Sequence, residues 1–354
     1  MTDVFPFGYP LHSVLYLTLY IVTLAVHAFF MSYVLAGSVW LAWAALFPGT
    51  NETPRARQLP AVCLRDWMPF VLSAAITAAV APLLFVQILY RQQFYTANLL
   101  LGWRWMIVIP VLIVAFYLLY VLKSKTISGW SAPARVGLGF ATAGCFVFVA
   151  FCWTSNHLLS LNEARWPDVY QSGTVTASVP VLLCRLLMWI AGTFVTMPVL
   201  LGRQLLSHKA DSGPRQLARI TLGGFTAVAV FGTAYIAQLE PQIRSAVFSV
   251  SAFPWIGIGV FGAALQLFGA LSQGRSGRFS RSMMLTVTIG NTLLLLAAAT
   301  LREIIRLAHV DTDKLLTETQ TASEISGFGL FLGFAVLNTI LIAFCIRIVR
   351  RRKV

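Results

Sequence analysis

The chain has 354 residues, of which 58% are hydrophobic and only 11% are charged, and its formal net charge is +14. Soluble proteins carry about 25% charged residues, so this composition excludes an ordinary soluble enzyme and indicates a polytopic membrane protein. The basic excess does not indicate nucleic-acid binding, because the basic residues gather in loops on one side of the predicted spans.

Nine segments are long and apolar enough to cross a bilayer, which takes about 20 residues per helix. The predicted spans are residues 13–48, 67–90, 103–122, 135–161, 178–206, 216–239, 245–272, 280–308 and 323–346. No connection between them is long enough for a soluble domain. We therefore expect one all-α integral-membrane domain that covers residues 1–354.

The basic residues predict the orientation of these spans. With the N-terminus outside, 18 of the 26 Lys and Arg residues fall in inner loops or in the C-terminal tail "RIVRRRKV". This placement obeys the positive-inside rule, and an even number of spans would break it. The sequence thus predicts an external N-terminus and an internal C-terminus, as in an inner (cytoplasmic) membrane protein of a bacterium.

The first span carries His27 within "LAVHAFFMSYVLAG", where it has no polar neighbour in sequence. A lone histidine on an apolar helix is commonly a hydrogen-bonded core residue. Polar residues inside a membrane bundle are more often functional, and a neutral imidazole is the usual axial ligand of haem. His27 is therefore a candidate haem ligand, while the lack of a CxxCH motif excludes covalently attached c-type haem.

Further polar residues collect at the predicted outer membrane level as the chain proceeds. They are Arg91 after the second span, Arg104 at the start of the third, Asn156 and His157 near the end of the fourth, and Arg185 one to two turns into the fifth. A buried arginine is costly unless it is paired, so Arg185 predicts an anionic partner such as a cofactor carboxylate. His157 is a second candidate haem ligand.

The eighth span ends in "LREIIRLAHVDTDK", which begins at residue 301 and places Glu303 and Arg306 one helical turn apart. At this spacing both side chains lie on the same side of the helix. They either snorkel to lipid headgroups or face the bundle interior. We expect Glu303 to face inward, within reach of a cofactor or of Arg185, with Arg306 on the same side.

These features together resemble the large subunit of cytochrome bd-type terminal oxidases, a nine-helix family with an external N-terminus and haems near the outer face. The resemblance covers nearly the whole chain. His27 before "AFFMSYVLAGSVWLAW" is similar to the family's histidine ligand of the oxygen-binding haem, and Asn156 in "TSNHLL" to its asparagine near the haems. Glu303-Ile-Ile-Arg306 is similar to its Glu-x-Gly-Arg, where the glutamate serves the high-spin haem.

The chain also departs from the family's pattern. Leu307-Ala308-His309 replaces Gln-Pro-Trp, and the third span lacks the family's carboxylates. The fifth span contains Cys184 and Arg185 in "VLLCRLLMWIAG", where the family has a histidine ligand of the low-spin haem. The segment "QLEPQIR" is too short for the long external loop that binds quinol. The resemblance therefore implies a reduced site without the low-spin haem and without a standard quinol site.

Taken as a resemblance, these features imply a haem-binding subunit of a respiratory electron-transfer complex, with b- or d-type haem and the redox site on the outer side. His27 and Glu303 would contact the iron, and Glu303 and Arg306 would serve catalysis. The haem propionates would be held by Arg91, Arg104, Arg185 and Arg306. Expected partners are lipid, a second membrane subunit and an external c-type cytochrome that delivers electrons to oxygen or another small acceptor. The alternative is a cofactor-free membrane anchor or assembly subunit; a transporter is less favoured, because the polar groups lie away from the membrane midplane.

Overall fold

The computed structural model describes residues 11–46, 55–174, 179–207, 213–311 and 315–316, together with single positions at 333, 336, 337, 340, 344 and 347. Throughout these residues the secondary structure is helical, without strands. The long helices are α1 (Leu11–Leu46), α2 (Arg55–Leu89), α5 (Val108–Lys123), α6 (Ala132–Ser160), α8 (Val179–Ser207), α9 (Pro214–Ala237), α11 (Phe253–Ser276) and α12 (Arg281–Leu307). The short elements are α3 (Arg91–Leu101), α4 (Trp103–Met106), η1 (Lys125–Gly129), η2 (Glu163–Arg165), α7 (Trp166–Ser172) and α10 (Pro241–Val247).

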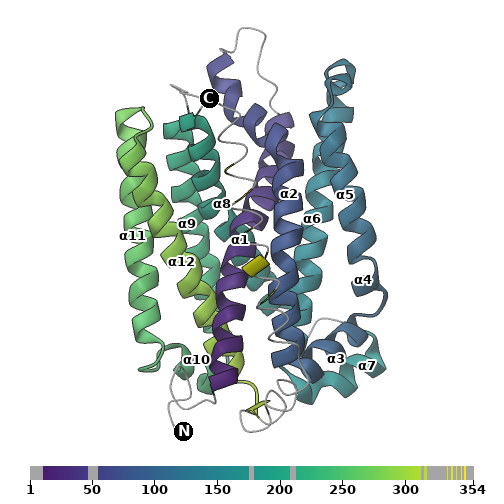
Figure 1. Ribbon diagram of the computed structural model, residues 1–354. Helices are drawn as coiled ribbons and strands as arrows, with labels where there is room; N and C mark the ends of the chain where they lie inside the picture. The colour runs from purple at the N-terminus through teal and green to yellow at the C-terminus, as the bar shows by residue number, and fades with distance from the viewer. Residues whose placement is uncertain are drawn as a thin grey trace.

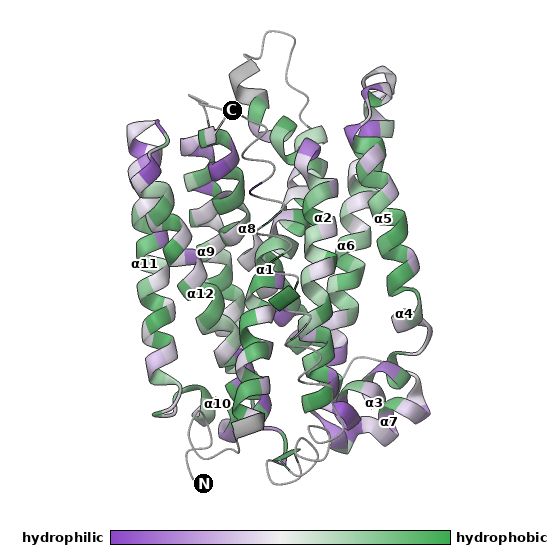
Figure 2. Cartoon of the chain, in the orientation of Figure 1, coloured by the Kyte–Doolittle hydropathy of each residue, from purple (hydrophilic) through white to green (hydrophobic). Residues whose placement is uncertain are grey.

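Eight membrane-spanning helices are present in the described part of the chain, with α4 and α5 together forming one span from Trp103 to Lys123. The chain is therefore an integral membrane protein by the length and apolar character of its helices. Apolar residues line the helices along their length and polar ones gather toward their ends (Figure 2). The ninth predicted span, residues 323–346, lies outside the described residues except for single positions, so both the count of nine and the orientation stay predictions.

The helices form two groups of four that meet along α1 and α8 (Figure 1). In the first group α1 contacts α2 and α6, and α5 contacts α2 and α6. In the second group α8 contacts α9 and α12, and α11 contacts α9 and α12. Because α1 also packs against α8 and α12, it is the central helix of the bundle.

Two predicted boundaries were wrong. α2 begins at Arg55, well before the predicted start of the second span at residue 67, and it runs through Arg65 and Asp66, whose side chains are 38% and 45% exposed. The seventh predicted span, 245–272, divides into α10 and α11, and α11 begins only at Phe253. Pro254 favours this start, because a proline in the first helical turn sacrifices no hydrogen bond within the helix.

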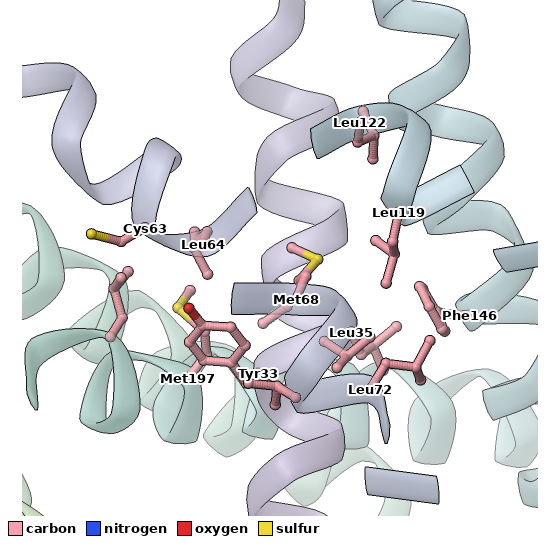
Figure 3. Packing of buried hydrophobic residues seen from close by; sticks show 14 of the residues in the cluster. Tyr33, Leu35, Cys63, Leu64, Met68, Leu72, Leu119, Leu122, Phe146 and Met197 are labelled. Carbon is pink, nitrogen blue, oxygen red and sulfur yellow. The ribbon is translucent and has the colours of Figure 1, made fainter. Parts of the chain in front are cut away.

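A large apolar core fills the first group and its border with α8 (Figure 3). Tyr33, Met68, Leu119, Phe146 and Met197 come from five different long helices, and each is at most 7% exposed. Their side chains interdigitate at the density of a protein interior, which holds the helices in one arrangement. This core positions α1, α6 and α8, which carry Tyr20, His157 and Arg185, and it positions α2, which leads into the turn at Tyr90.

Glycines set the distance between α11 and α12. A Cβ at Gly262 would come within 2.7 Å of the Gly290 carbonyl oxygen, and a Cβ at Gly290 would come within 2.6 Å of the Gly262 carbonyl oxygen. Small residues at such crossings allow the backbones of membrane helices to approach closely. The contact fixes α12, whose last two turns carry Glu303 and Arg306.

Candidate functional site

A buried polar cluster lies at the end of the bundle where α1 begins and where α3, α7 and α10 are located (Figure 1). We call it the Glu303 cluster; its members are Tyr20, Tyr90, His157, Arg302, Glu303 and Arg306. They come from α1, the turn between α2 and α3, α6 and α12. Segments far apart in sequence therefore converge on the last turns of α12.

Glu303 is at the centre of this cluster and has no exposed surface. Its Oε1 accepts a hydrogen bond from Arg302 Nη1 at 2.8 Å, and its Oε2 accepts one from the Tyr90 hydroxyl at 2.9 Å. Arg306 Nη1 lies 3.7 Å from Oε2. The expectation that Glu303 faces inward beside Arg306 is confirmed, whereas its partners are Arg302 and Arg306 instead of Arg185.

Tyr90 serves the carboxylate as a neutral donor. Its side chain is 1% exposed, and burial, followed by the nearby charge of Glu303, raises the pKa of the phenol well above its ordinary value. The phenol therefore stays protonated over the physiological pH range and donates a hydrogen bond to Glu303. The ring also lies under the Arg306 guanidinium, with 4.4 Å between the guanidinium carbon and the ring centroid, which adds a cation–π contact.

His157 binds the same arginines from the α6 side. Its Nδ1 is 2.7 Å from Arg306 Nη2 and 3.3 Å from Arg302 Nη2. A guanidinium can only donate, so Nδ1 accepts, and in the neutral ring the proton is on Nε2. Nε2 is buried and has no hydrogen-bond partner among the described residues. In this tautomer Nε2 donates and offers no lone pair to a metal, and the role of His157 as a haem ligand stays a prediction.

Arg185 and Asn156, two other predicted site residues, are buried at the same end of the bundle. Arg185 is 3% exposed, donates to the Tyr235 hydroxyl on α9 and stacks on that ring at 5.0 Å. Within the described part of the chain, no carboxylate lies within ion-pair distance of it. Asn156 donates to Asn98 Oδ1 at 2.7 Å and thereby ties α6 to α3. Among the described residues the partner of Arg185 is thus Tyr235, and a cofactor carboxylate as its anionic partner stays a prediction.

Two predicted arginines do not join the buried site. Arg91 is exposed at the start of α3. Arg104 is partly exposed and stacks on its neighbour Trp103 at 5.1 Å. His309 is also partly exposed, and its Nδ1 bonds to the Ile305 carbonyl within its own helix end. These residues lie at the edge of the bundle.

His27 is separate from the Glu303 cluster. It is on α1, seven residues after Tyr20, which places it about 10 Å deeper along the helix. Its Nδ1 is 3.0 Å from the Ala75 carbonyl oxygen on α2. A carbonyl can only accept, so Nδ1 carries the proton, and the Nε2 of the neutral ring keeps its lone pair. No described residue bonds to Nε2, and the side chain is partly exposed.

Charge in the buried site is unbalanced. Among the described buried residues, Arg185 and Arg306 bring two positive charges and Glu303 brings one negative charge. The partly exposed Arg302 adds a third positive charge beside Glu303. Sequence reasoning missed Tyr20, Tyr90 and Tyr235, which satisfy these groups. Their contacts join residues 50 to 282 positions apart, and nothing in the local sequence marks them.

Within the described residues, no group of three or more His, Cys, Asp or Glu side chains could hold a metal ion. A haem iron needs only one or two protein ligands, so this observation bears on metal clusters and mononuclear sites. Comparisons of the chain with protein-family models, with curated proteins and with solved structures found no match.

Proposed function

We propose that the chain is a haem-binding membrane subunit of a bacterial respiratory electron-transfer complex, similar to the large subunit of cytochrome bd-type oxidases. The observation that carries the proposal is the hydrogen bonding of the two ring nitrogens of His27. Its Nδ1–H bonds to a backbone carbonyl, and its Nε2 lone pair has no partner among the described residues. Histidines that bind metals almost always donate their second ring nitrogen in this way, which fixes both tautomer and orientation.

The donor groups of the chain fit haem at one position and resist it at two others. His27 offers the nitrogen that an axial ligand requires. Glu303 has both oxygens engaged by Arg302 and Tyr90, so it would act beside the haem as a charge partner instead of as an iron ligand. His157 presents the N–H of its Nε2 and therefore no lone pair for an iron ion. Bound haem would supply the one-electron chemistry and the site for oxygen or another small acceptor.

The remaining parts of the proposal concern charge and partners. Guanidinium groups match carboxylates in geometry and charge, so Arg185 and Arg306 are suited to hold haem propionates from the cluster end of the bundle. We infer that this end is the outer side and that electrons arrive from an external c-type cytochrome. A second membrane subunit would complete the complex. The acidic segment 311–324, a candidate docking site for a basic cytochrome, lies almost entirely outside the described residues.

A cofactor-free anchor or assembly subunit is the second candidate, and the Glu303 cluster favours it. Its carboxylate accepts two hydrogen bonds and pairs with two arginines, as expected of a buried charge that stabilises a fold. In that case the cluster is structural, and His27 is a core histidine that joins α1 to α2.

A reduced-minus-oxidised visible spectrum of the purified full-length protein distinguishes the two candidates. The haem proposal predicts Soret and α bands and a stoichiometric haem content by pyridine haemochrome assay. A featureless spectrum from a monodisperse, folded preparation expressed with ample haem supply would reject the haem proposal and favour the anchor.

A further inference from the structure

One exposed face of α9 carries a largely apolar groove. Its volume is about 580 Å³, and its lining residues all belong to α9, among them Arg219, Leu222, Gly223, Ala227, Val230 and Phe231. They recur every three or four residues, so they form one stripe along the helix. A Cβ at Gly223 would meet no atom within 4 Å, and Leu222 and Val230 are 48% and 59% exposed. Among the described helices, α8 and α11 therefore pack on other faces of α9 and leave this groove open.

The groove has about the length of one membrane leaflet. Arg219 and Phe231, at its two ends, are twelve residues apart, which is about 18 Å along a helix. The hydrocarbon core of a bilayer is about 30 Å thick, so one leaflet is about 15 Å. A hydrocarbon chain that entered the groove at Arg219 would therefore reach the far end of the groove near the bilayer midplane.

Exposed arginines gather at the end of the groove that Arg219 marks. The other end of α9 reaches the Glu303 end of the bundle, where Tyr235 contacts Arg185, so the N-terminal arginines of α9 lie at the opposite end (Figure 1). A Cβ at Gly277 would lie 3.9 Å from Arg215 Nη2, which brings the end of α11 beside the start of α9. The exposed arginines of α9, α11 and α12 at this end of the bundle are Arg215, Arg219, Arg275, Arg278 and Arg281. None of them takes part in an ion pair with a carboxylate of the described residues.

We infer that this groove binds an anionic phospholipid, with an acyl chain along α9 and the phosphate at Arg219. A long arginine side chain can lie along apolar surface while its guanidinium stays at headgroup level. The neighbouring arginines give the headgroup a positive surrounding, which attracts anionic lipid. A transmembrane helix in the groove would cover the apolar stripe and leave the arginines without an anion, so the charges favour lipid. The inference does not depend on the haem proposal, because the groove shares no residue with the Glu303 cluster or with the contact of His27.

The test is native mass spectrometry of the full-length protein, titrated in detergent with phosphatidylglycerol and separately with phosphatidylcholine. Wild type should retain phosphatidylglycerol at the lower concentration, because both lipids offer acyl chains and only phosphatidylglycerol carries a net negative charge. Arg219→Gln should raise the half-saturating phosphatidylglycerol concentration about fivefold, which corresponds to about 1 kcal/mol for one basic group, and should leave phosphatidylcholine unchanged. Gly223→Leu fills the groove without a clash inside the protein, so it should weaken retention of both lipids.

Two variants serve as matched controls. Arg244→Gln removes an exposed arginine on α10, at the other end of the bundle. Gly257→Leu adds the same side chain as Gly223→Leu on α11, at a glycine that also has open space around it. Both controls should retain the two lipids as wild type does.

Three results would overturn the inference. Equal half-saturating concentrations of the two lipids in wild type would show ordinary lipid contact without recognition of the headgroup. Unchanged retention in both Arg219→Gln and Gly223→Leu would place any bound lipid elsewhere. A disulfide in a Gly223→Cys/Leu337→Cys variant, within one chain or between two copies, would show that a helix occupies the groove in place of lipid. A featureless haem spectrum together with the expected lipid responses would refute the proposed function and leave the lipid site standing.

Discussion

Replacement of Glu303 by glutamine tests how the charged groups of the cluster are held. The variant keeps the shape of the side chain and removes its charge. Glu303 lies 2.8 Å from Arg302 Nη1 and 3.7 Å from Arg306 Nη1, and it has no exposed surface. Removing one member of a buried ion pair costs about 3–5 kcal/mol, because the remaining charges stay buried without compensation. We expect Glu303→Gln to lower the free energy of unfolding by about 3 kcal/mol, toward the lower end because the amide still accepts one hydrogen bond.

The assay is equilibrium unfolding in mixed micelles, followed by circular dichroism. Glu163→Gln is the matched control: Glu163 is exposed and also accepts a 2.8 Å hydrogen bond, from Gln93. The amide oxygen of the glutamine variant still accepts this hydrogen bond, and Glu163 has no buried charge partner among the described residues, so the control should lose about 1 kcal/mol or less. If the two variants lose the same free energy within about 1 kcal/mol, Glu303 does not compensate buried arginines, and the account of the cluster is wrong.

Three further predictions concern the fold and the cluster. Tyr90→Phe should lower the free energy of unfolding by about 1.5–3 kcal/mol, the value of a hydrogen bond to a charged group. Because burial raises the pKa of Tyr90, this contribution is present below the unfolded pKa of about 10 and is lost as pH rises through the folded pKa. The difference in unfolding free energy between wild type and variant should therefore narrow in strongly alkaline solution, and a difference independent of pH would contradict the prediction. Gly290→Leu should prevent α11 and α12 from closing and reduce folded yield more than Gly257→Leu, at a glycine with open space around it; equal yields would refute the role of the close contact. A reporter fused to the C-terminus should be active only on the cytoplasmic side, and an external reading would overturn the nine-span orientation.

The spans were predictable because the backbone N–H and C=O groups of an apolar segment in lipid must pair within that segment, which makes it a helix. Hydropathy alone therefore locates the helix. The burial of Glu303 beside Arg306 was predictable for a related reason: their spacing places both on one side, and the apolar run before them points that side inward. The starts of α2 at Arg55 and of α11 at Phe253 were harder to predict. Charged residues such as Arg65 can extend a helix beyond the bilayer core, and a proline such as Pro254 can start one late.

The partners within the site could not be predicted from the sequence. Tyr20, Tyr90 and Tyr235 are ordinary aromatic residues of apolar segments, and they reach the arginines only because the two groups of helices pack along α1 and α8. The tautomers of His27 and His157 depend in the same way on tertiary partners, a carbonyl in one case and guanidinium groups in the other. These partners set which ring nitrogen of each histidine carries the proton, and a local sequence cannot show them.

The most direct test of the proposed function is the haem content and reduced-minus-oxidised spectrum of His27→Ala beside those of His309→Ala. Both variants remove one imidazole, and His309 is partly exposed and bonded within its own helix end. The haem account predicts that His27→Ala inserts in the membrane, folds and loses one chromophore, while His309→Ala keeps the wild-type spectrum. A His27→Ala protein with the haem content and bands of wild type would contradict the assignment of His27 as the iron ligand.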